Sequence, residues 1–155
     1  GQRPAGVPWI EEREESYVLE APLPPDSTEV QRVRAIREHF AVCRQEGLEE
    51  DLSIGAVAAR EDVLRGDYEG IRAFFTCVPE RAASSRLVVR PRGRYGEILH
   101  HGSYWDMERS FRTLLAFIED SGLAAAGDFY EYDLLNDMAT ADHEDYILCI
   151  SVQVR

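Results

Sequence analysis

The chain has 155 residues, 45% of them hydrophobic and 30% charged, a composition typical of one folded globular domain. A formal net charge of −12, from 17 Lys and Arg against 29 Asp and Glu, excludes direct binding of this segment to nucleic-acid phosphates and favours a cationic small ligand. Apolar runs are all shorter than the roughly 20 residues that a membrane-spanning helix needs, so we expect no membrane partner.

Residues 1–15 contain two prolines and a charged cluster, and they predict a loose lead-in. Because the first residue is Gly and not Met, we expect this lead-in to follow an upstream region. The cysteines are odd in number, and each lies in an apolar run: Cys43, Cys77 and Cys149. This pattern predicts buried thiols of a cytoplasmic protein, and it argues against a disulfide framework or a zinc site.

Residues 28–47 predict an amphipathic helix. Asp26 and Glu29 have the spacing of a capping box, which satisfies the free N–H groups of a first helical turn. Gly47 is a typical helix terminator. Apolar residues recur every three or four positions and predict one buried face, made of Val30, Val33, Ile36, Phe40 and Cys43.

A second helix is predicted over residues 104–121, with Gly122 as its terminator. Ser103 has the spacing to cap the backbone N–H of Asp106, after a flexible turn at Gly102. The apolar face of this helix is predicted to consist of Met107, Phe111, Leu114, Leu115 and Ile118.

Strands are predicted at residues 16–21, 52–61, 70–78, 86–99, 128–135 and 146–154. The order strand, helix, strand, strand thus occurs twice, and FAVCRQEGL (Phe40–Leu48) aligns with LAFIEDSGL (Leu115–Leu123) at an offset of 75 residues. We predict an α+β fold of duplicated β-α-β-β units. Their antiparallel sheets would form a distorted barrel or cleft with two helices packed outside, and a ligand would bind between the halves.

The histidines do not predict a metal site. His100 and His101 are neighbours on a predicted strand, so their side chains point to opposite faces and cannot chelate one metal together. His39 lies on a helix and is expected to be partly exposed to solvent, which leaves haem binding without support. We therefore expect neither a metal nor a cofactor.

The strand DFYEYDLL offers a possible ligand surface. Alternation places Phe129, Glu131 and Asp133 on one face, and Tyr130 and Tyr132 on the other. A face of aromatic and acidic side chains suits a cationic ligand. In the alternative interpretation the carboxylates face solvent and the tyrosines form the core, and alternation alone leaves both open. Further lining is expected from neighbouring aromatic residues: Tyr68, Phe75, Tyr104, Trp105 and Tyr146.

These segments resemble a known family. The run RYGEILHHGSYWDMERSFRTLLAFIEDSGL, followed by GDFYEYDLL and EDYILCISVQV, resembles the GyrI-like effector-binding domain of MerR-family multidrug-sensing transcription regulators, which has a SOUL-like fold. The family's His-x-Gly-Ser/Thr-Tyr junction is matched by His100, Gly102, Ser103 and Tyr104. The resemblance implies one domain over residues 16–155, with repeats at about 16–80 and 86–155.

The same resemblance implies a pocket for lipophilic, often cationic compounds, with Glu131 at its base. Many members carry Tyr two residues later, where this chain has Asp133, and this departure bears on the ligand class. The function expected is effector binding in a transcription regulator that contacts DNA through a domain absent from this chain and forms a homodimer through the missing region. The alternative is a stand-alone binding protein or hydrolase for small reactive or toxic compounds, in which Glu131 activates a water molecule.

Overall fold

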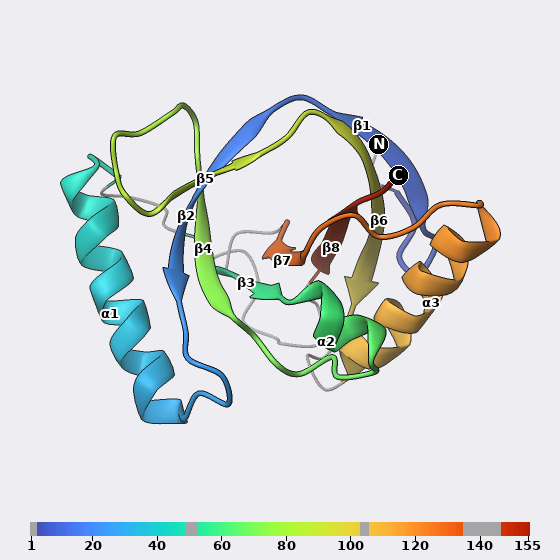
Figure 1. Cartoon of the computed structure of the whole chain (residues 1–155), viewed down its shortest axis with the longest axis horizontal. Helices are drawn as coiled ribbons and strands as arrows, with labels where there is room; N and C mark the ends of the chain where they lie inside the picture. Colours follow the sequence, from blue (N-terminus) through green and yellow to red (C-terminus); the bar gives the residue numbers. More distant parts are fainter. Residues whose placement is uncertain (1–2, 49–52, 103–105, 135–146) are drawn as a thin grey trace.

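The computed structural model describes residues 3–48, 53–102, 106–134 and 147–155. In these ranges eight strands form one curled antiparallel sheet in the order β1-β6-β8-β7-β3-β4-β2-β5, and helices pack on its outer side (Figure 1). None of the described helices is long and apolar enough to cross a lipid bilayer. In chain order the elements are β1 (Trp9–Arg13), β2 (Ser16–Pro22), α1 (Glu29–Gln45), β3 (Gly55–Ala58), α2 (Arg60–Leu64), β4 (Ala73–Val78), β5 (Leu87–Arg90), β6 (Gly93–His101), α3 (Met107–Asp120), β7 (Phe129–Asp133) and β8 (Ile147–Gln153).

The two halves of the chain have the same connectivity, which confirms the predicted α+β duplication. In the first half β2 pairs with β4 and β4 with β3, and in the second half β6 pairs with β8 and β8 with β7. The middle strands β3 and β7 pair with each other at the centre, where Ala56 lies opposite Glu131. These two residues are 131 − 56 = 75 positions apart, which is the offset of the sequence repeat. A pseudo-twofold axis therefore passes through this pair.

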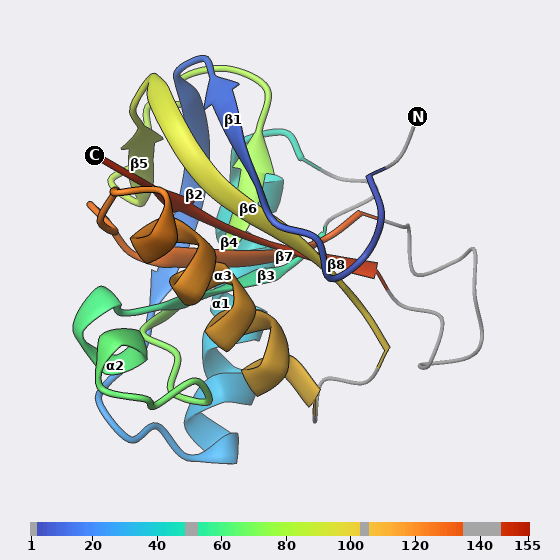
Figure 2. The same cartoon turned by 90° about the vertical axis from the view of Figure 1, so that its right-hand side faces the viewer.

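The N-terminal segment corrects one expectation, because Trp9–Arg13 is a strand and not part of a loose lead-in. It pairs with β6, with Arg13 opposite Gly93, and Ser16 of the following strand β2 lies opposite Arg90 of β5. The chain passes directly from β1 to β2 and from β5 to β6, so these two antiparallel pairs form one bent ladder that curls the sheet (Figure 2). The predicted strand 86–99 is thus two strands, because Pro91 has no N–H to donate at the bend.

Helix α1 differs from its prediction in its cap and in its buried face. Its capping box is made by Thr28 and Gln31, while Asp26 lies in a turn with φ of 53°. Val30 is 67% exposed, whereas Cys43 is fully buried. An α-helix turns by about 100° per residue, so these two positions, 13 residues apart, point about 140° away from each other. The apolar residues spaced three or four positions apart are therefore spread around the helix and do not form one buried face.

Helix α1 buries the polar side chain of His39, which was expected to be partly solvated. It is only 1% exposed, and its Nε2 lies 2.7 Å from the hydroxyl of Thr76. Burial lowers the pKa of His39, which keeps the ring neutral. Cys43 and Cys149 are buried as predicted, but Cys77 is exposed.

Helix α3 confirms its predicted face and its end. Met107, Phe111, Leu114 and Ile118 are buried, and Leu115 packs at the edge of this core. Gly122 follows the helix with φ of 74°, and Gly47 follows α1 with φ of 81°. Both are left-handed positions that glycine adopts easily. The matching helix ends support the duplicated unit.

Residues 52–61 were predicted as one strand, but the strand ends at Ala58 and α2 begins at Arg60. The reason is a long-range contact, since the Asp128 carboxylate accepts a hydrogen bond from the backbone N–H of Arg60 at 2.8 Å. A second oxygen of Asp128 binds the Arg72 guanidinium at 2.7 Å. These bonds turn the chain into the short helix beside the centre of the sheet.

Candidate functional site

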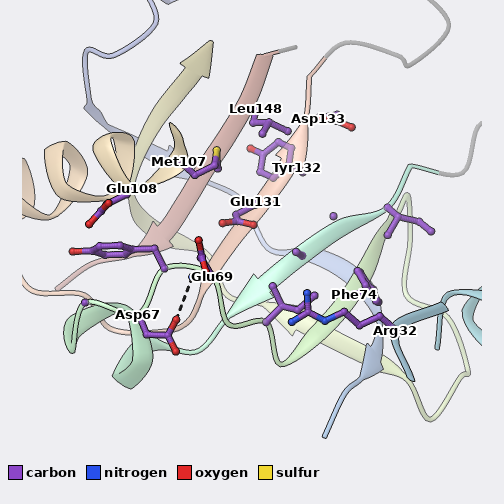
Figure 3. A pocket seen from close by; sticks show the side chains of 16 residues that line it. Arg32, Asp67, Glu69, Phe74, Met107, Glu108, Glu131, Tyr132, Asp133 and Leu148 are labelled. Carbon is purple, nitrogen blue, oxygen red and sulfur yellow. Dashed lines mark hydrogen bonds between the residues drawn. The ribbon is translucent and has the colours of Figure 1, made fainter. Parts of the chain in front are cut away.

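A cavity of about 650 Å³ lies over the central strands β3 and β7, between α1 and α3 (Figure 3). Both repeats contribute to it, as predicted for a cleft between the halves. The residues lining it are Arg32, Ile54, Gly55, Ala56, Gly66, Asp67, Tyr68, Glu69, Ile71, Phe74, Met107, Glu108, Glu131, Tyr132, Asp133 and Leu148. Its size is within the range of small-molecule sites.

Glu131 is the carboxylate at the centre of the floor. It is half-buried on β7, opposite Ala56 of β3 and Ile150 of β8. Burial raises the pKa of Glu131 from 4.5 to about 7. A group with this pKa carries its charge most readily when a cation lies beside it.

Small residues on β3 make this floor possible. A side-chain carbon added to Gly55 would lie 2.4 Å from both the carbonyl oxygen of Glu131 and the ring of Phe75. Such contacts are far below van der Waals distance, so only glycine allows β3 and β7 to pack this closely. Next to it, the methyl group of Ala56 leaves the space above Glu131 open.

The loop after α2 forms one wall. A carboxylate oxygen of Asp67 accepts hydrogen bonds from the backbone N–H groups of Glu69 and Gly70, each at 3.2 Å. This turn presents Tyr68 to the cavity, where its ring stacks on Phe111 with a centroid distance of 5.3 Å and an interplanar angle of 19°. The aromatic wall is therefore anchored in the core against α3.

Charge is distributed unevenly along the cavity. The acidic lining side chains are Asp67, Glu69, Glu108, Glu131 and Asp133, and the basic one is Arg32. Figure 3 shows Glu108 and Asp67 toward the α3 side and Glu131 and Glu69 near the middle. Arg32 lies with Phe74 on the α1 side, and Asp133 lies apart from both groups. The described cavity thus has an acidic end and a basic end.

The predicted site residues fall into three groups. Glu131, Asp133 and Tyr68 line the cavity. Phe129 and Phe75 were predicted to line it but are in the core: Phe129 is fully buried near Phe111, and Phe75 packs edge-on against Tyr130 on the inner side of the sheet. The remaining predictions, Tyr104, Trp105 and Tyr146, lie outside the described residues, as does the cap predicted at Ser103.

The two faces predicted for β7 are present. Phe129 belongs to the outer core under α3, and Tyr130 belongs to the inner cluster with Val18, Val57 and Phe75. Tyr130 packs inside, as in the alternative interpretation, while Glu131 and Asp133 border the cavity. Tyr132 lies on the opposite face from Glu131 and also reaches the lining.

His100 and His101 point to opposite sides of β6 as expected. His100 is 1% exposed, and its Nδ1 lies 2.7 Å from the Ser110 hydroxyl on α3, whereas His101 is exposed. The buried histidine therefore joins the strand to the helix.

Several lining residues could not be identified from the sequence. Arg32 lies on the predicted polar side of α1, and Glu69 lies in a turn that any surface loop could contain. Met107 was assigned to the helix core, which is where it lies, but it also borders the cavity. Only the pairing of the two halves brings these side chains to one place.

No family model matches the chain. Over 123 residues it is 30% identical to the multidrug-efflux transporter 2 regulator of Bacillus subtilis, a match that covers 79% of this chain and 44% of the relative. The chain thus spans less than half the length of that regulator.

Solved structures share the fold. The C-terminal domain of EcmrR superposes with a TM-score of 0.64 at 14% identity, covering 96% of this chain and 97% of that domain. The resemblance to the GyrI-like effector-binding domain is confirmed. The Bacillus relative is described as a regulator of an efflux transporter, and the EcmrR domain shares the fold of this chain.

Two further solved structures share the fold and carry other descriptions. A hydrolase from Listeria innocua superposes with a TM-score of 0.71 at 13% identity, covering 98% of this chain and 93% of its own. A protein solved with bound tetraphenylphosphonium has a TM-score of 0.55 at 14% identity, with 96% and 94% coverage. At these identities the likeness establishes the fold alone.

Proposed function

We propose that this chain is the effector-binding domain of a bacterial, cytoplasmic transcription regulator and that it binds a lipophilic cation in the cavity between its halves. One observation carries the ligand class: the half-buried carboxylate of Glu131 faces a cavity of about 650 Å³ with Tyr68 on its wall. A cation beside Glu131 compensates the ionised carboxylate, which burial otherwise disfavours. An aromatic face adds a favourable interaction with the same charge.

The contact with DNA is proposed to come from a region of the regulator outside this chain, as is the contact that forms a homodimer. A net charge of −12 makes the chain itself a poor partner for phosphate. Ligand binding acts on such a regulator only if the ligand favours one arrangement of its domains over another. The cavity is suited to this role because α1, α3 and the central strands all border it.

The ligand class can be tested with two matched probes: a biphenylmethyl-trimethylammonium cation and its neutral analogue with tert-butyl carbon in place of nitrogen. Binding of both is measured by titration calorimetry to wild type and to Glu131→Gln, which keeps the size and removes the charge. The cation should bind roughly 30- to 150-fold more weakly to the variant, because a partly buried ion contact is lost, while the neutral probe is unaffected.

The control is Glu119→Gln, an exposed residue of α3 outside the cavity lining that changes the net charge by the same amount. It should bind both probes as wild type does. Equal losses of cation and neutral probe in Glu131→Gln would contradict charge recognition by Glu131. Equal losses in the two variants would assign the effect to the overall negative field.

The alternative function is hydrolysis of a small reactive compound. It is favoured by the Listeria hydrolase of the same fold and by the pKa of Glu131 near 7, which suits a general base. The test is release of a chromogenic alcohol from ester probes and ring opening of lactone probes to their hydroxy acids. Turnover that disappears in Glu131→Gln and persists in Glu119→Gln would favour the enzyme over the binding domain.

A further inference from the structure

Arg32 occupies an inward position on α1. The side of this helix that faces the sheet runs through residues at intervals of four, three and four, namely Arg32, Ile36, His39 and Cys43. Such intervals keep side chains on one helical face. His39 and Cys43 are buried, Arg32 is half-buried, and at the first turn of the helix this stripe reaches the cavity.

The charge of Arg32 has no carboxylate partner among the described residues. Its Nε donates a hydrogen bond to the neutral hydroxyl of Ser27 at 2.9 Å, and the described ion pairs do not include it. Arg13 and Arg72, in contrast, each bind a buried glutamate. The half-buried Arg60, Arg86 and Arg90 are also outside the described ion pairs, but of these arginines only Arg32 lines the cavity. An arginine held at a cavity without an acid, in a chain with a net charge of −12, is available to an anionic group of a ligand.

The pseudo-twofold axis explains why this arginine lies across the cavity from the acidic end. Arg32 corresponds to Met107 at the repeat offset, because 107 − 32 = 75. The axis passes through Ala56 and Glu131, which are related by the same offset and pair directly. Arg32 and Met107 therefore lie on opposite sides of the cavity, as Figure 3 shows, and Glu108 follows Met107 on the acidic side. Duplication has placed a cation at one equivalent position and acids beside the other.

We propose that the cavity takes a zwitterionic ligand, with its cationic group at Glu131 and a carboxylate or similar anionic group at the guanidinium of Arg32. This inference rests on the proposed function and adds a second point of recognition to it. The planar guanidinium offers two parallel N–H donors that match the two oxygens of a carboxylate. Phe74, beside Arg32 in the lining, provides an apolar flank for the linking part of the ligand.

The test adds one group to the cationic probe. Biphenylmethyl-trimethylammonium is compared with its 4′-carboxylate, and the same pair is made with a single phenyl spacer so that two lengths are sampled. In a chain of charge −12, a carboxylate on the probe weakens binding unless a cation receives it. Wild type should therefore bind the carboxylate form of at least one spacer as tightly as the plain cation or more tightly.

The variants are Arg32→Gln and Arg32→Lys, with Arg34→Gln as the control. Arg34 is exposed on the same helix and does not line the cavity, so its substitution changes the net charge equally. Arg32→Gln should weaken the zwitterion about tenfold or more and leave the plain cation unchanged or slightly tighter. Arg32→Lys should keep part of the zwitterion affinity, and Arg34→Gln should keep all of it.

Failure of this inference is distinguishable from failure of the proposed function. If wild type binds the plain cation through Glu131 but binds both carboxylate probes weakly, irrespective of Arg32, the zwitterion proposal is wrong and the cation site stands. The same conclusion follows if Arg32→Gln and Arg34→Gln reduce binding equally. If wild type binds no probe, the cation site and the zwitterion proposal are both wrong.

Discussion

The raised pKa of Glu131 predicts how stability should depend on pH. Burial raises this pKa from 4.5 to about 7 in the folded protein, whereas the unfolded chain keeps the ordinary value. Below pH 4.5 both states hold the proton, and above pH 7 both have lost it. Between these values the folded state keeps a proton that the unfolded state releases, so the contribution of Glu131 to stability falls as pH rises through this window.

The magnitude follows from the size of the shift. A difference of 7 − 4.5 = 2.5 pKa units, at about 1.4 kcal/mol per unit, gives a loss of about 3 kcal/mol over the whole window. Glu131→Gln removes this titration and keeps the shape of the side chain. The unfolding free energy of the variant minus that of wild type should therefore rise by up to about 3 kcal/mol from pH 4.5 to pH 7, and then stay constant.

Guanidinium denaturation at pH 4.5, 5.5, 6.5, 7.5 and 8.5 measures this difference. All other ionisable groups are common to the two proteins, so their effects largely cancel when the two curves are subtracted. A difference that stays flat over the whole range would refute the argument, because Glu131 would then titrate alike in the folded and unfolded states.

Ligand binding should show the same titration with the opposite sign. The ammonium probe binds the ionised carboxylate, so below pH 7 its affinity should decrease by up to about tenfold for each unit that the pH is lowered. The affinity of the neutral probe should stay constant. Calorimetry in buffers of different ionisation enthalpy should detect a proton released as the cation binds at pH 6. Parallel pH profiles for the two probes would assign the titration to another group.

Two predictions concern residues away from the cavity. Arg13→Met should destabilise the fold by about 2 kcal/mol, because it leaves the carboxylate of Glu97, only 1% exposed, without the cation that binds it. This value is smaller than that of a fully buried ion pair because Arg13 is 45% exposed. Arg3→Met, which breaks an exposed pair, should change the denaturation midpoint little, and an equal effect of the two would contradict the role given to burial. Thr28→Ala should cost about 1 kcal/mol through loss of the α1 capping box, while Asp26→Ala should cost less; the reverse order in thermal denaturation would restore the cap expected from the sequence.

Periodicity and punctuation made the repeated unit visible in the sequence. The apolar face of residues 107–118 and the glycines after both helices are local signals, because the period of a helix and the left-handed preference of glycine act within one segment. The alternation of β7 likewise separated Glu131 from Tyr130. What alternation could not decide is which face meets the cavity, since this depends on the elements that cover each side.

Local signals failed where distant partners decide the outcome. Trp9–Arg13 is a strand because it pairs with β6. His39 of α1 can be buried because Thr76 of β4 provides a hydrogen-bond partner for its ring. Phe75 and Phe129 lie on the expected strands, but their side chains are buried in the core and do not line the cavity. In the same way, three-residue apolar spacing suggested a face of α1 that the fold does not bury.

The sequence alone determined the α+β duplication and the carboxylate at position 131, because repeats and strand alternation are written in the order of the residues. The tertiary structure decided what surrounds that carboxylate. Pairing of β3 with β7 placed Ala56 against Glu131 on the pseudo-twofold axis and brought Arg32 and Met107 to opposite sides of one cavity. Residues so far apart in the chain come to line one cavity only when the two halves associate, and no local sequence pattern encodes that arrangement.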